Sequence, residues 1–462
     1  MAKITVLSIV LGSILAMPSS AQDLSIEARA ASARGDTSAA IVAMQAHVDG
    51  HPDDVSAKLD LARYYMWTGA YAKVDSLLSP LAAQNAEAAA LLASNAAWAG
   101  KIDQALALNA AGLQNDPANF MANYTQATAL RQTAQAYRAW PYVEAVEQAK
   151  PGSKDAIDLR RITRVRTASE VSVSWGLTDD SDDIQVNRYG LDANIRLADN
   201  WRLLGNISQY DYSAPFGSGY EPISGGTSID DTQYWIGVSN TPAQDSQWIA
   251  SIGTSDSDAG NEFIGLLRWN QRVNDDWSFS LDADRNRLGI SPRSLSLGLM
   301  RNQYLGQVRI NPGFNWVFDG YASFQDISDG NNSIDLQIAG RRAVLRTQKV
   351  QLDLGAAAQW LSFDENPSNG YYSPSNYRRI SLTASAYFPF GDNYGLALRA
   401  GLGIQRDETF DNWESANDIS LEYTAGILSD WEFKAFAGYS DRAQPAGLYD
   451  TTAFGMQLKR RF

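Results

Sequence analysis

The chain has 462 residues, no cysteine and a formal net charge of −14. The absence of cysteine excludes disulfide bonds, thiol catalysis and cysteine-ligated metal sites, and the negative charge argues against nucleic acid as a partner. The two histidines, His47 and His51, are four residues apart, a spacing that suits two ligands on one helix face. Because no third ligand lies nearby, we expect neither a metal nor a cofactor.

The first residues predict secretion. Lys3 precedes an apolar run from residue 4 to residue 17, and Ser19 and Ala21 occupy the small-residue positions of a cleavage site. The run is shorter than the ~20 apolar residues of a membrane-spanning helix, so we interpret residues 1–21 as a signal peptide and not as a membrane anchor. No later apolar run is long enough for a spanning helix, so any membrane crossing must use strands.

Residues 22–156 have a helical composition, rich in Ala, Leu and Gln. Three similar segments, ARGDTSAAI, WTGAYAKVD and WAGKIDQAL, carry Gly35, Gly69 and Gly100, which are 34 and 31 residues apart. This spacing is close to the period of about 34 residues in tetratricopeptide repeats. It predicts three to four helical pairs in a short array whose concave face binds another molecule, with an ordinary helical bundle as the alternative. Residues 157–167 continue a charged run that we interpret as a linker.

From residue 168 to residue 462, apolar residues recur with period two. In WSFSLDAD, Trp277, Phe279 and Leu281 point to one side, and Ser278 and Ser280 point to the other. The same alternation occurs in VQLDLGAAAQW and DISLEYTAGI. It is typical both of a soluble β-sandwich and of a transmembrane barrel, so the turns have to distinguish the two.

The connections between the sixteen candidate strands alternate between short turns and longer polar loops. The longer loops are residues 213–231, 255–261, 288–299, 327–333, 364–376, 407–418 and 441–450. Six of the short turns lead to an aromatic residue of the kind that forms a membrane-interface girdle: Trp201, Trp248, Trp277, Trp316, Tyr394 and Trp431. This pattern predicts an outer-membrane barrel of about sixteen antiparallel strands, with fourteen or eighteen as alternatives.

The predicted fold class is therefore α plus transmembrane β, with a short tetratricopeptide-like helical array followed by the barrel. An even number of strands brings both barrel ends to one side, which places the array in the periplasm of a Gram-negative bacterium. The chain ends on Phe462, and Phe454, Met456 and Leu458 share its parity. This ending resembles the terminal signal read by the barrel-assembly machinery, although Arg460 departs from the apolar pattern.

Sixteen strands enclose a lumen wide enough for an aqueous channel. The strand positions predicted to face it mix acids and bases, which suits a neutral or weakly charged hydrophilic solute and argues against a strongly polyanionic one. The aromatic residues on this face either stack on sugar rings or fill space against a plug loop. The candidates for lining the pore or binding a glycan are Arg196, Arg202, Asp282, Asp284, Arg309, Asp319, Tyr321, Asp353, Tyr387, Arg399, Glu422, Lys434 and Phe436.

We expect no enzymatic activity. The barrel sequence contains no histidine, which excludes a Ser-His arrangement. Asp282 and Asp284 form an acidic pair, but their regular strand positions are typical of pore lining. The glycine-rich segment GDNYGLALRAGLG is not followed by a helix, so it does not predict phosphate binding.

The segment GYYSPSNYRRISL, residues 370–382, resembles the Gly-Tyr-Phe/Tyr-Ser-Pro-x-x-Tyr segment of the cellulose-synthase-operon protein C family. A tetratricopeptide array followed by an outer-membrane barrel is also the architecture of Gram-negative exopolysaccharide exporters. By turn parity the segment is an extracellular loop that leads into a strand with Arg379 facing the lumen and Ile380 facing lipid. The outer-mouth motif residues are Tyr371, Tyr372, Ser373, Pro374 and Tyr377.

The resemblance implies export of a growing β-linked glucan to the cell surface, as in cellulose biosynthesis and biofilm formation. The repeats would then be a scaffold for periplasmic proteins. The implied partners are the polysaccharide chain, outer-membrane lipid, periplasmic proteins and the barrel-assembly machinery acting through Phe462. The exporters carry many more repeats, and this short array cannot reach an inner-membrane synthase. The alternative is a general porin or structural barrel whose repeats bind periplasmic proteins.

Overall fold

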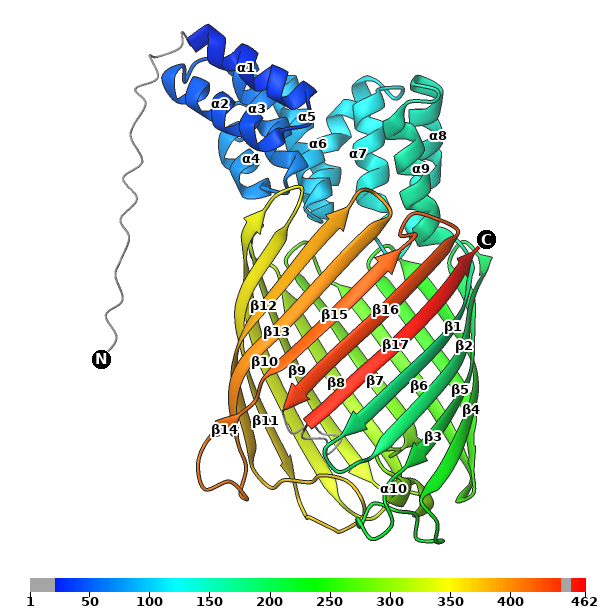
Figure 1. Cartoon of the computed structure of the whole chain (residues 1–462). Coiled ribbons are helices and arrows are strands. Elements are labelled where there is room, and N and C mark those ends of the chain that lie inside the picture. The colour runs from blue at the N-terminus through cyan, green and yellow to red at the C-terminus, as the bar shows by residue number, and fades with distance from the viewer. Residues whose placement is uncertain (1–20, 442–449) are drawn as a thin grey trace, which may run out of the picture.

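The computed structural model describes residues 21–441 and 450–462. It consists of a helical array and a β-barrel, and the array lies across one end of the barrel (Figure 1). The predicted signal peptide lies outside the described residues, apart from Ala21, and so does most of the predicted loop 441–450. In the described ranges, none of the helices is both long and apolar enough to cross a membrane.

The array is built from antiparallel helical pairs. The pairs α1/α2, α3/α4 and α5/α6 turn at the three repeat glycines, which have φ angles of 80°, 75° and 78° and so adopt a left-handed conformation that favours glycine. The fourth pair, α7/α8, turns through the 3₁₀ helix η1 instead. The elements are α1 (Ala21–Ala33), α2 (Thr37–Gly50), α3 (Val55–Trp67), α4 (Tyr71–Leu78), α5 (Ala86–Trp98), α6 (Ile102–Asn115), α7 (Phe120–Leu130), η1 (Ala136–Ala139), α8 (Trp140–Ala149) and α9 (Lys154–Thr167).

Side-chain caps and small buried residues stabilise these helices. Asp36, Asp54, Asn85 and Asn119 each accept a hydrogen bond from a backbone N–H in the first turn of the next helix, an interaction that contributes about 1 kcal/mol. Alanines fill much of the space between pairs, so the helices pack closely, and Met44, Leu61, Val74 and Leu78 form the centre of the first core. The array is therefore a packed domain.

The predicted linker, residues 157–167, is wrong, because these residues belong to helix α9. Ser153 caps the helix through the backbone N–H of Ala156. Leu159 and Thr163 are buried on one face, while the charged residues occupy the other. The high charge density suggested a solvated linker, but it belongs to the outer face of an amphipathic helix.

Sixteen antiparallel strands form a closed ring, as predicted. The first and last strands pair from Glu170 with Arg461 to Asp180 with Thr451, which closes the barrel. The strands are β1 (Glu170–Asp180), β2 (Gln185–Ala198), β3 (Trp201–Ser213), β4 (Ser228–Ala243), β5 (Ser246–Ser257), β6 (Gly260–Arg272), β7 (Trp277–Arg287), β8 (Met300–Ile310), β9 (Trp316–Ile327), β10 (Asn332–Arg346), β11 (Gln351–Phe363), β12 (Tyr377–Phe390), β13 (Tyr394–Arg406), β15 (Asp418–Ala425), β16 (Trp431–Asp441) and β17 (Asp450–Arg461). The two-residue strand β14 (Glu414–Ser415) lies in the loop between β13 and β15.

The outer face of the ring is apolar. Ile252, Ile338, Leu382 and Leu402 are each more than 60% exposed, which is the expected environment of side chains that contact lipid. The six aromatic residues predicted for the girdle are 41–50% exposed and lie at the short-turn end. Arg460, the outward residue that departs from the apolar pattern, places its guanidinium 5.1 Å from the centre of the Trp431 ring, so its charge contacts the girdle.

Two of the predicted long loops, 255–261 and 327–333, are wrong, and the second is the short turn 328–331 between β9 and β10. The segment 255–261 is a tight turn, because β5 runs to Ser257 and β6 starts at Gly260. Its polar residues suggested a loop, but Ser255 points into the barrel and is buried there. Its hydroxyl donates to Asp231 and accepts a bond from the Arg287 guanidinium at 3.0 Å. Ser255 is therefore polar because it faces the inside of the barrel from strand β5, and not because it lies in a loop.

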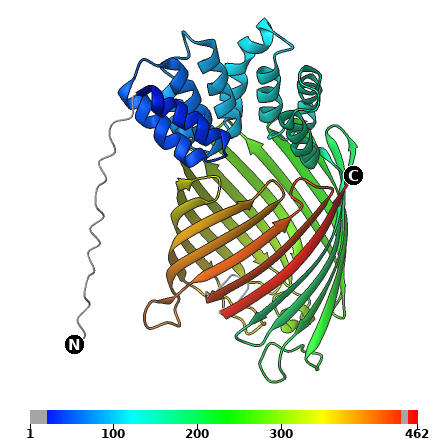
Figure 2. The same ribbon diagram turned by 45° about the horizontal axis from the view of Figure 1, so that its top comes forward.

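The two barrel ends differ in what covers them. The helical array covers the end with the short turns, and the C-terminus lies at the same end (Figure 1). Figure 2 shows the helices arranged along the rim of this mouth. The longer loops and the short helix α10 (Pro292–Ser296) lie at the opposite end.

We expect Leu61→Ala to destabilise the array by about 2–5 kcal/mol, because it leaves a cavity in the first core. Leu61 is 0% exposed in that core. The measurement is urea unfolding of the full-length protein in detergent, followed by its helical circular-dichroism signal. Val42→Ala is the control, since Val42 is 71% exposed on α2. Equal effects of the two substitutions would contradict this assignment of the core.

Candidate functional site

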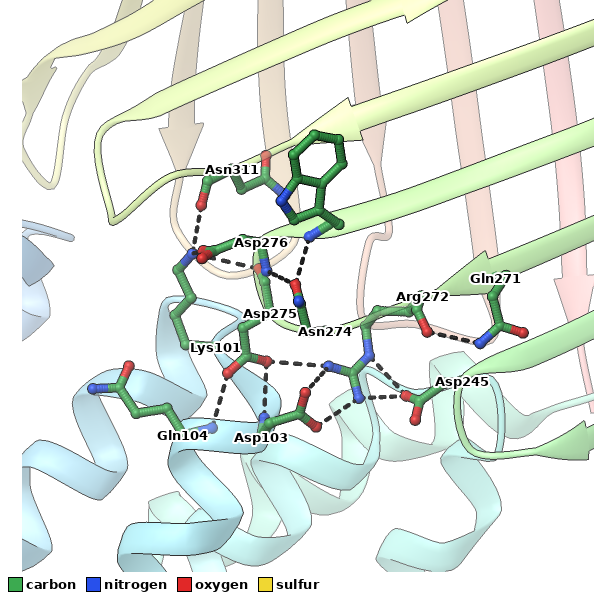
Figure 3. Close-up of polar contacts among 11 residues, drawn as sticks. Lys101, Asp103, Gln104, Asp245, Gln271, Arg272, Asn274, Asp275, Asp276 and Asn311 are labelled. Carbon is green, nitrogen blue, oxygen red and sulfur yellow. Dashed lines mark hydrogen bonds and ion pairs between the residues drawn. The ribbon is translucent and has the colours of Figure 1, made fainter.

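The array is joined to the barrel by a polar network around Lys101, the residue that precedes α6 (Figure 3). The Lys101 ammonium is buried and donates to the Asp276 carboxylate and to the Asn311 carbonyl oxygen, both at 2.6 Å. Asp276 lies in the turn between β6 and β7, and Asn311 lies in the turn between β8 and β9. One buried cation of the array therefore binds two neighbouring turns of the barrel.

Asp275 supplies the cap that helix α6 lacks in its own sequence. Lys101 makes no side-chain cap, and the backbone N–H groups of Asp103 and Gln104 donate instead to the two Asp275 carboxylate oxygens, each at 2.8 Å. The positive end of the helix dipole favours this carboxylate. Arg272 completes the network, because its guanidinium contacts Asp103 through two 2.9 Å bonds and also pairs with Asp275.

Two further contacts fix the array along the rim. The loop after α7 binds the turn between β4 and β5, where Ala134 N–H donates to the Gln244 carbonyl oxygen at 2.9 Å. On α9, Arg164 pairs with Asp430 at 2.7 Å, in the turn between β15 and β16. The array is thus held to short turns at separate points of the ring, and any solute that enters at this end passes beside it.

The residues predicted to line the pore lie on the inner strand face, opposite to the exposed apolar residues. Many of them are paired. Asp282 binds Arg268 at 2.6 Å, and Asp319 binds Arg309 at 2.6 Å and Arg341 at 2.5 Å. The remaining pairs are Asp284 with Arg301, Asp353 with Arg346, Glu422 with Lys434, and Arg196 with Asp199. Arg202 contacts backbone carbonyls, and Arg399 forms no ion pair within the described residues.

The three predicted aromatic candidates also lie on the inner face. Tyr321 donates to the Asp335 carboxylate at 2.8 Å. Tyr387 lies across Gly395, and Phe436 lies across Gly455; at both glycines a Cβ atom would meet the neighbouring ring. The rings of Tyr387 and Phe436 therefore lie flat against the inner wall. Phe436 remains 46% exposed, so one of its faces is accessible from the lumen.

A cavity of about 570 Å³ lies between the loop after α7 and the inner wall. Its lining is dominated by amides, serines and one aromatic candidate, with the acids and bases balanced. The residues include Gln244, Gln247, Asn270, Gln307, Gln337 and Tyr321. Uncharged donors and acceptors of this kind suit hydroxyl-rich solutes.

The outer-mouth motif stabilises the loop that carries it. Tyr371 and Tyr377 are 5% and 0% exposed and pack with Leu361 and Phe363 in a small apolar core. The Tyr371 hydroxyl donates to Asp329 at 2.8 Å and accepts a bond from Asn331. Burial raises the pKa of this tyrosine, so its hydroxyl remains a donor at neutral pH.

The other motif residues contribute to the same loop structure. Tyr372 donates to Asp407 in the next loop, Ser373 donates to Asn366 at 2.9 Å, and Pro374 is buried. Beyond the loop, Arg379 is 5% exposed and pairs with Asp418, while Ile380 is 54% exposed on the outer face. The motif thus holds neighbouring loops together at the barrel end opposite the array.

The loop that contains α10 folds inward at the outer mouth. On one side Leu295 packs on Tyr212 and Ile229, which point inward from β3 and β4. On the other side Leu288 and Leu299 join the apolar core around Tyr371. The Ser291 hydroxyl donates to the Gly370 carbonyl oxygen at 2.6 Å. This loop therefore bridges separate parts of the ring and narrows the outer mouth.

The sequence interpretation missed the docking residues Lys101, Arg272 and Asp275. The turn NDDW was identified as a short turn, but nothing in it signals a partner about 170 positions earlier. It also missed Arg268 and Arg301, the partners of the two predicted aspartates. These two arginines could have been found, because they fall on the inward parity of β6 and β8.

Comparison with known proteins defines the fold class. No protein-family model matches the chain, and no curated protein matches it. Among solved structures, a bacterial polysaccharide outer membrane secretin has a TM-score of 0.54 at 13% identity, over 64% of this chain and 98% of that chain. The barrel of this chain is therefore an outer-membrane-type β-barrel.

Two other solved structures are less similar. CdiB from Acinetobacter baumannii has a TM-score of 0.41 at 12% identity, over 64% of this chain and 60% of that chain. A tetratricopeptide repeat protein from Parabacteroides merdae ATCC 43184 has a TM-score of 0.25 at 18% identity, over 32% of this chain and 59% of that chain. The fold assignment depends on the secretin.

We expect Asp275→Ala to loosen the start of α6. The amides of Asp103 and Gln104 lose their acceptor, so they should exchange with solvent about tenfold faster, which corresponds to ~1.4 kcal/mol of lost protection. Hydrogen–deuterium exchange of peptides covering residues 101–108 measures this. Asp258→Ala is the control, because Asp258 is exposed in the turn at the other barrel end. Unchanged exchange in the Asp275 variant would contradict the cap.

We expect replacement of residues 290–298 by a Gly-Ser linker to increase ion conductance, since it removes the inward-folded loop. Single-channel recordings in planar bilayers measure the effect. The control replaces residues 411–413, in the loop of β14 that projects away from the barrel wall (Figure 1). If both variants conduct like the wild type, the α10 loop does not restrict the pore.

Proposed function

We propose that the chain forms an outer-membrane channel that exports an exopolysaccharide, a cellulose-like or other β-linked glycan, with the helical array in the periplasm. One observation carries the proposal. An array of helical pairs is fixed over the short-turn mouth of a sixteen-stranded barrel by a buried polar network. A channel for small solutes needs no such domain at its entrance, whereas a polymer must be received and aligned before it enters.

The interior chemistry supports a polymer rich in hydroxyl groups. The cavity beneath the array offers amide and hydroxyl groups at the start of the path. Tyr321 in the wall of this cavity, and Tyr387 and Phe436 elsewhere on the inner face, offer ring surfaces, and aromatic faces stack on the apolar faces of sugar rings. The resemblance of residues 370–382 to the cellulose-synthase-operon family and the barrel's likeness to a polysaccharide secretin support the same substrate class.

We propose that the array recruits periplasmic proteins instead of reaching an inner-membrane synthase itself. It has four helical pairs and one additional helix in the described range, which makes it short. Its helices beyond the rim remain accessible, as Figure 2 shows for the first pairs. Both chain ends that flank the barrel lie at the short-turn side, in agreement with a periplasmic array.

We propose a transport role and not an enzymatic one. Both histidines belong to the array, where His47 bonds to Asp54 at 3.0 Å and its ring stacks on His51. The barrel sequence has no histidine. The lumenal carboxylates Asp282 and Asp319 are each held by arginines, which suits a charged wall more than acid–base chemistry.

Deletion of the gene should abolish surface polysaccharide, and the wild-type gene should restore it. Dye binding to colonies and the amount of extracellular matrix measure the effect. A matched complementation with the Asp258→Ala gene controls for expression. Unchanged surface polysaccharide, together with free conduction of small ions in bilayers, would refute export and favour the alternative of a general porin.

A further inference from the structure

A second cavity under the array has a basic lining. It has a volume of about 540 Å³ and lies between the array and the strands β1, β2, β3, β16 and β17, beside the barrel closure. Seven arginines and lysines line it, against three carboxylates. The first cavity, which shares Thr133 and Ala134 with it, has balanced charges. The positive charge is therefore confined to one side of the entrance.

Three of these cations have no carboxylate partner. Arg131, at the end of α7, and Arg166, in the last turn of α9, form no ion pair with any residue that the structure describes, and the Arg131 Nε atom is buried without a hydrogen bond. Arg202 donates only to backbone carbonyls and to Asn194. These guanidinium groups come from the array and from the barrel, so the cavity exists only when the two are joined.

The charges on the array side act on each other. Burial lowers the pKa of Arg131; the neighbouring Tyr124 raises it in part, and the nearby charge of Arg166 lowers it. Close positive charges of this kind are stabilised when an anion binds between them. On the barrel side, Lys459 lies near Glu170 and Glu432 at 3.3 and 3.8 Å, and Arg461 also pairs with Glu432. Glu170 and Glu432 thus pair with Lys459 and Arg461, and Glu170 also attracts Arg202, so the unpaired positive charge lies mainly on Arg131 and Arg166.

We propose that this cavity binds acidic groups on the polymer that enters the barrel, so that the exported glycan carries carboxylate or phosphate substituents. The inference rests on the proposed export function and specifies its substrate class. A guanidinium group suits both anions, because its planar array of donors matches their paired oxygens. This inference revises the expectation of a neutral or weakly charged solute, which was based on strand positions alone and did not include the two arginines of the array.

Binding of oligosaccharides to the full-length protein in detergent tests the proposal. Isothermal titration compares oligogalacturonate with a cello-oligosaccharide of equal length, and inorganic phosphate is a third probe. We expect oligogalacturonate to bind at least about tenfold more tightly than the neutral oligomer, and its affinity to fall with added salt, since screening weakens charge contacts.

The variant Arg131→Gln/Arg166→Gln should remove this preference for the acidic oligomer. Arg34→Gln/Arg161→Gln is the matched control, because it removes the same charge from the array at residues that do not line the cavity. Arg131→Lys/Arg166→Lys keeps the charge but loses the planar pairs of donors, so its affinity for the acidic oligomer should lie between those of the wild type and the glutamine variant. Thermal melting of each variant shows that its fold is intact.

Four results would overturn the proposal. The first is that the wild type binds the acidic and neutral oligomers equally well, and the second is that it binds neither. The third is that phosphate binds as tightly as oligogalacturonate. The fourth is that the control variant loses as much binding of oligogalacturonate as Arg131→Gln/Arg166→Gln does. The first leaves export of a neutral glycan intact, because that function is judged separately by surface polysaccharide in the deletion strain. If the deletion strain makes normal surface polysaccharide and the purified protein still prefers the acidic oligomer, the export function is refuted and the binding proposal is not.

Discussion

The position of Lys101 is the constraint on which the rest of the structure depends. An ammonium buried to this extent loses several kcal/mol of hydration, which its contacts must replace. Asp276 and the Asn311 carbonyl provide those contacts, and both come from barrel turns. Because these contacts exist only in this arrangement, any movement of the array away from the mouth would break the bonds of the ammonium to both barrel turns. The entrance, its two cavities and the path into the lumen all follow from that joint.

The barrel has two chemically different ends. At the array end, two cavities between the helices and the wall are lined mostly by charged and polar groups. At the outer end, loops bury Leu288, Ile327 and Phe363 around tyrosines, so the ring is partly closed by a small apolar core. The array end of the lumen therefore presents polar groups, and the opposite end is narrowed by packed apolar side chains. The wall between them is lined by ion pairs that neutralise each other.

Much of the fold could be predicted from the sequence, because local patterns encode it. Period-two alternation identified the strands, the alternation of short and long connections distinguished the two barrel ends, and the three repeat glycines marked the helical turns. The wrong predictions for α9 and for the segment around Ser255 have a common cause. A polar residue can face solvent, or it can face the protein interior and bond to a partner there, and its position in the sequence does not distinguish the two. Charge on α9 and serines near Ser255 were interpreted as solvent-exposed, yet both belong to regular elements. The basic cavity could not be predicted, since it needs Arg131 and Arg202 to meet across two domains.

The cap that Asp275 provides for α6 also means that this helix is completed only after part of the barrel has folded. The array precedes the barrel in the sequence, so its helices are made first, and α6 then starts without a side-chain acceptor. Its first turn becomes fully bonded only after the β6–β7 turn has formed. Until then this end of the third pair frays more easily than the starts of α3 and α5, which carry their own caps. Formation of the barrel therefore makes the first turn of α6 in the array more rigid.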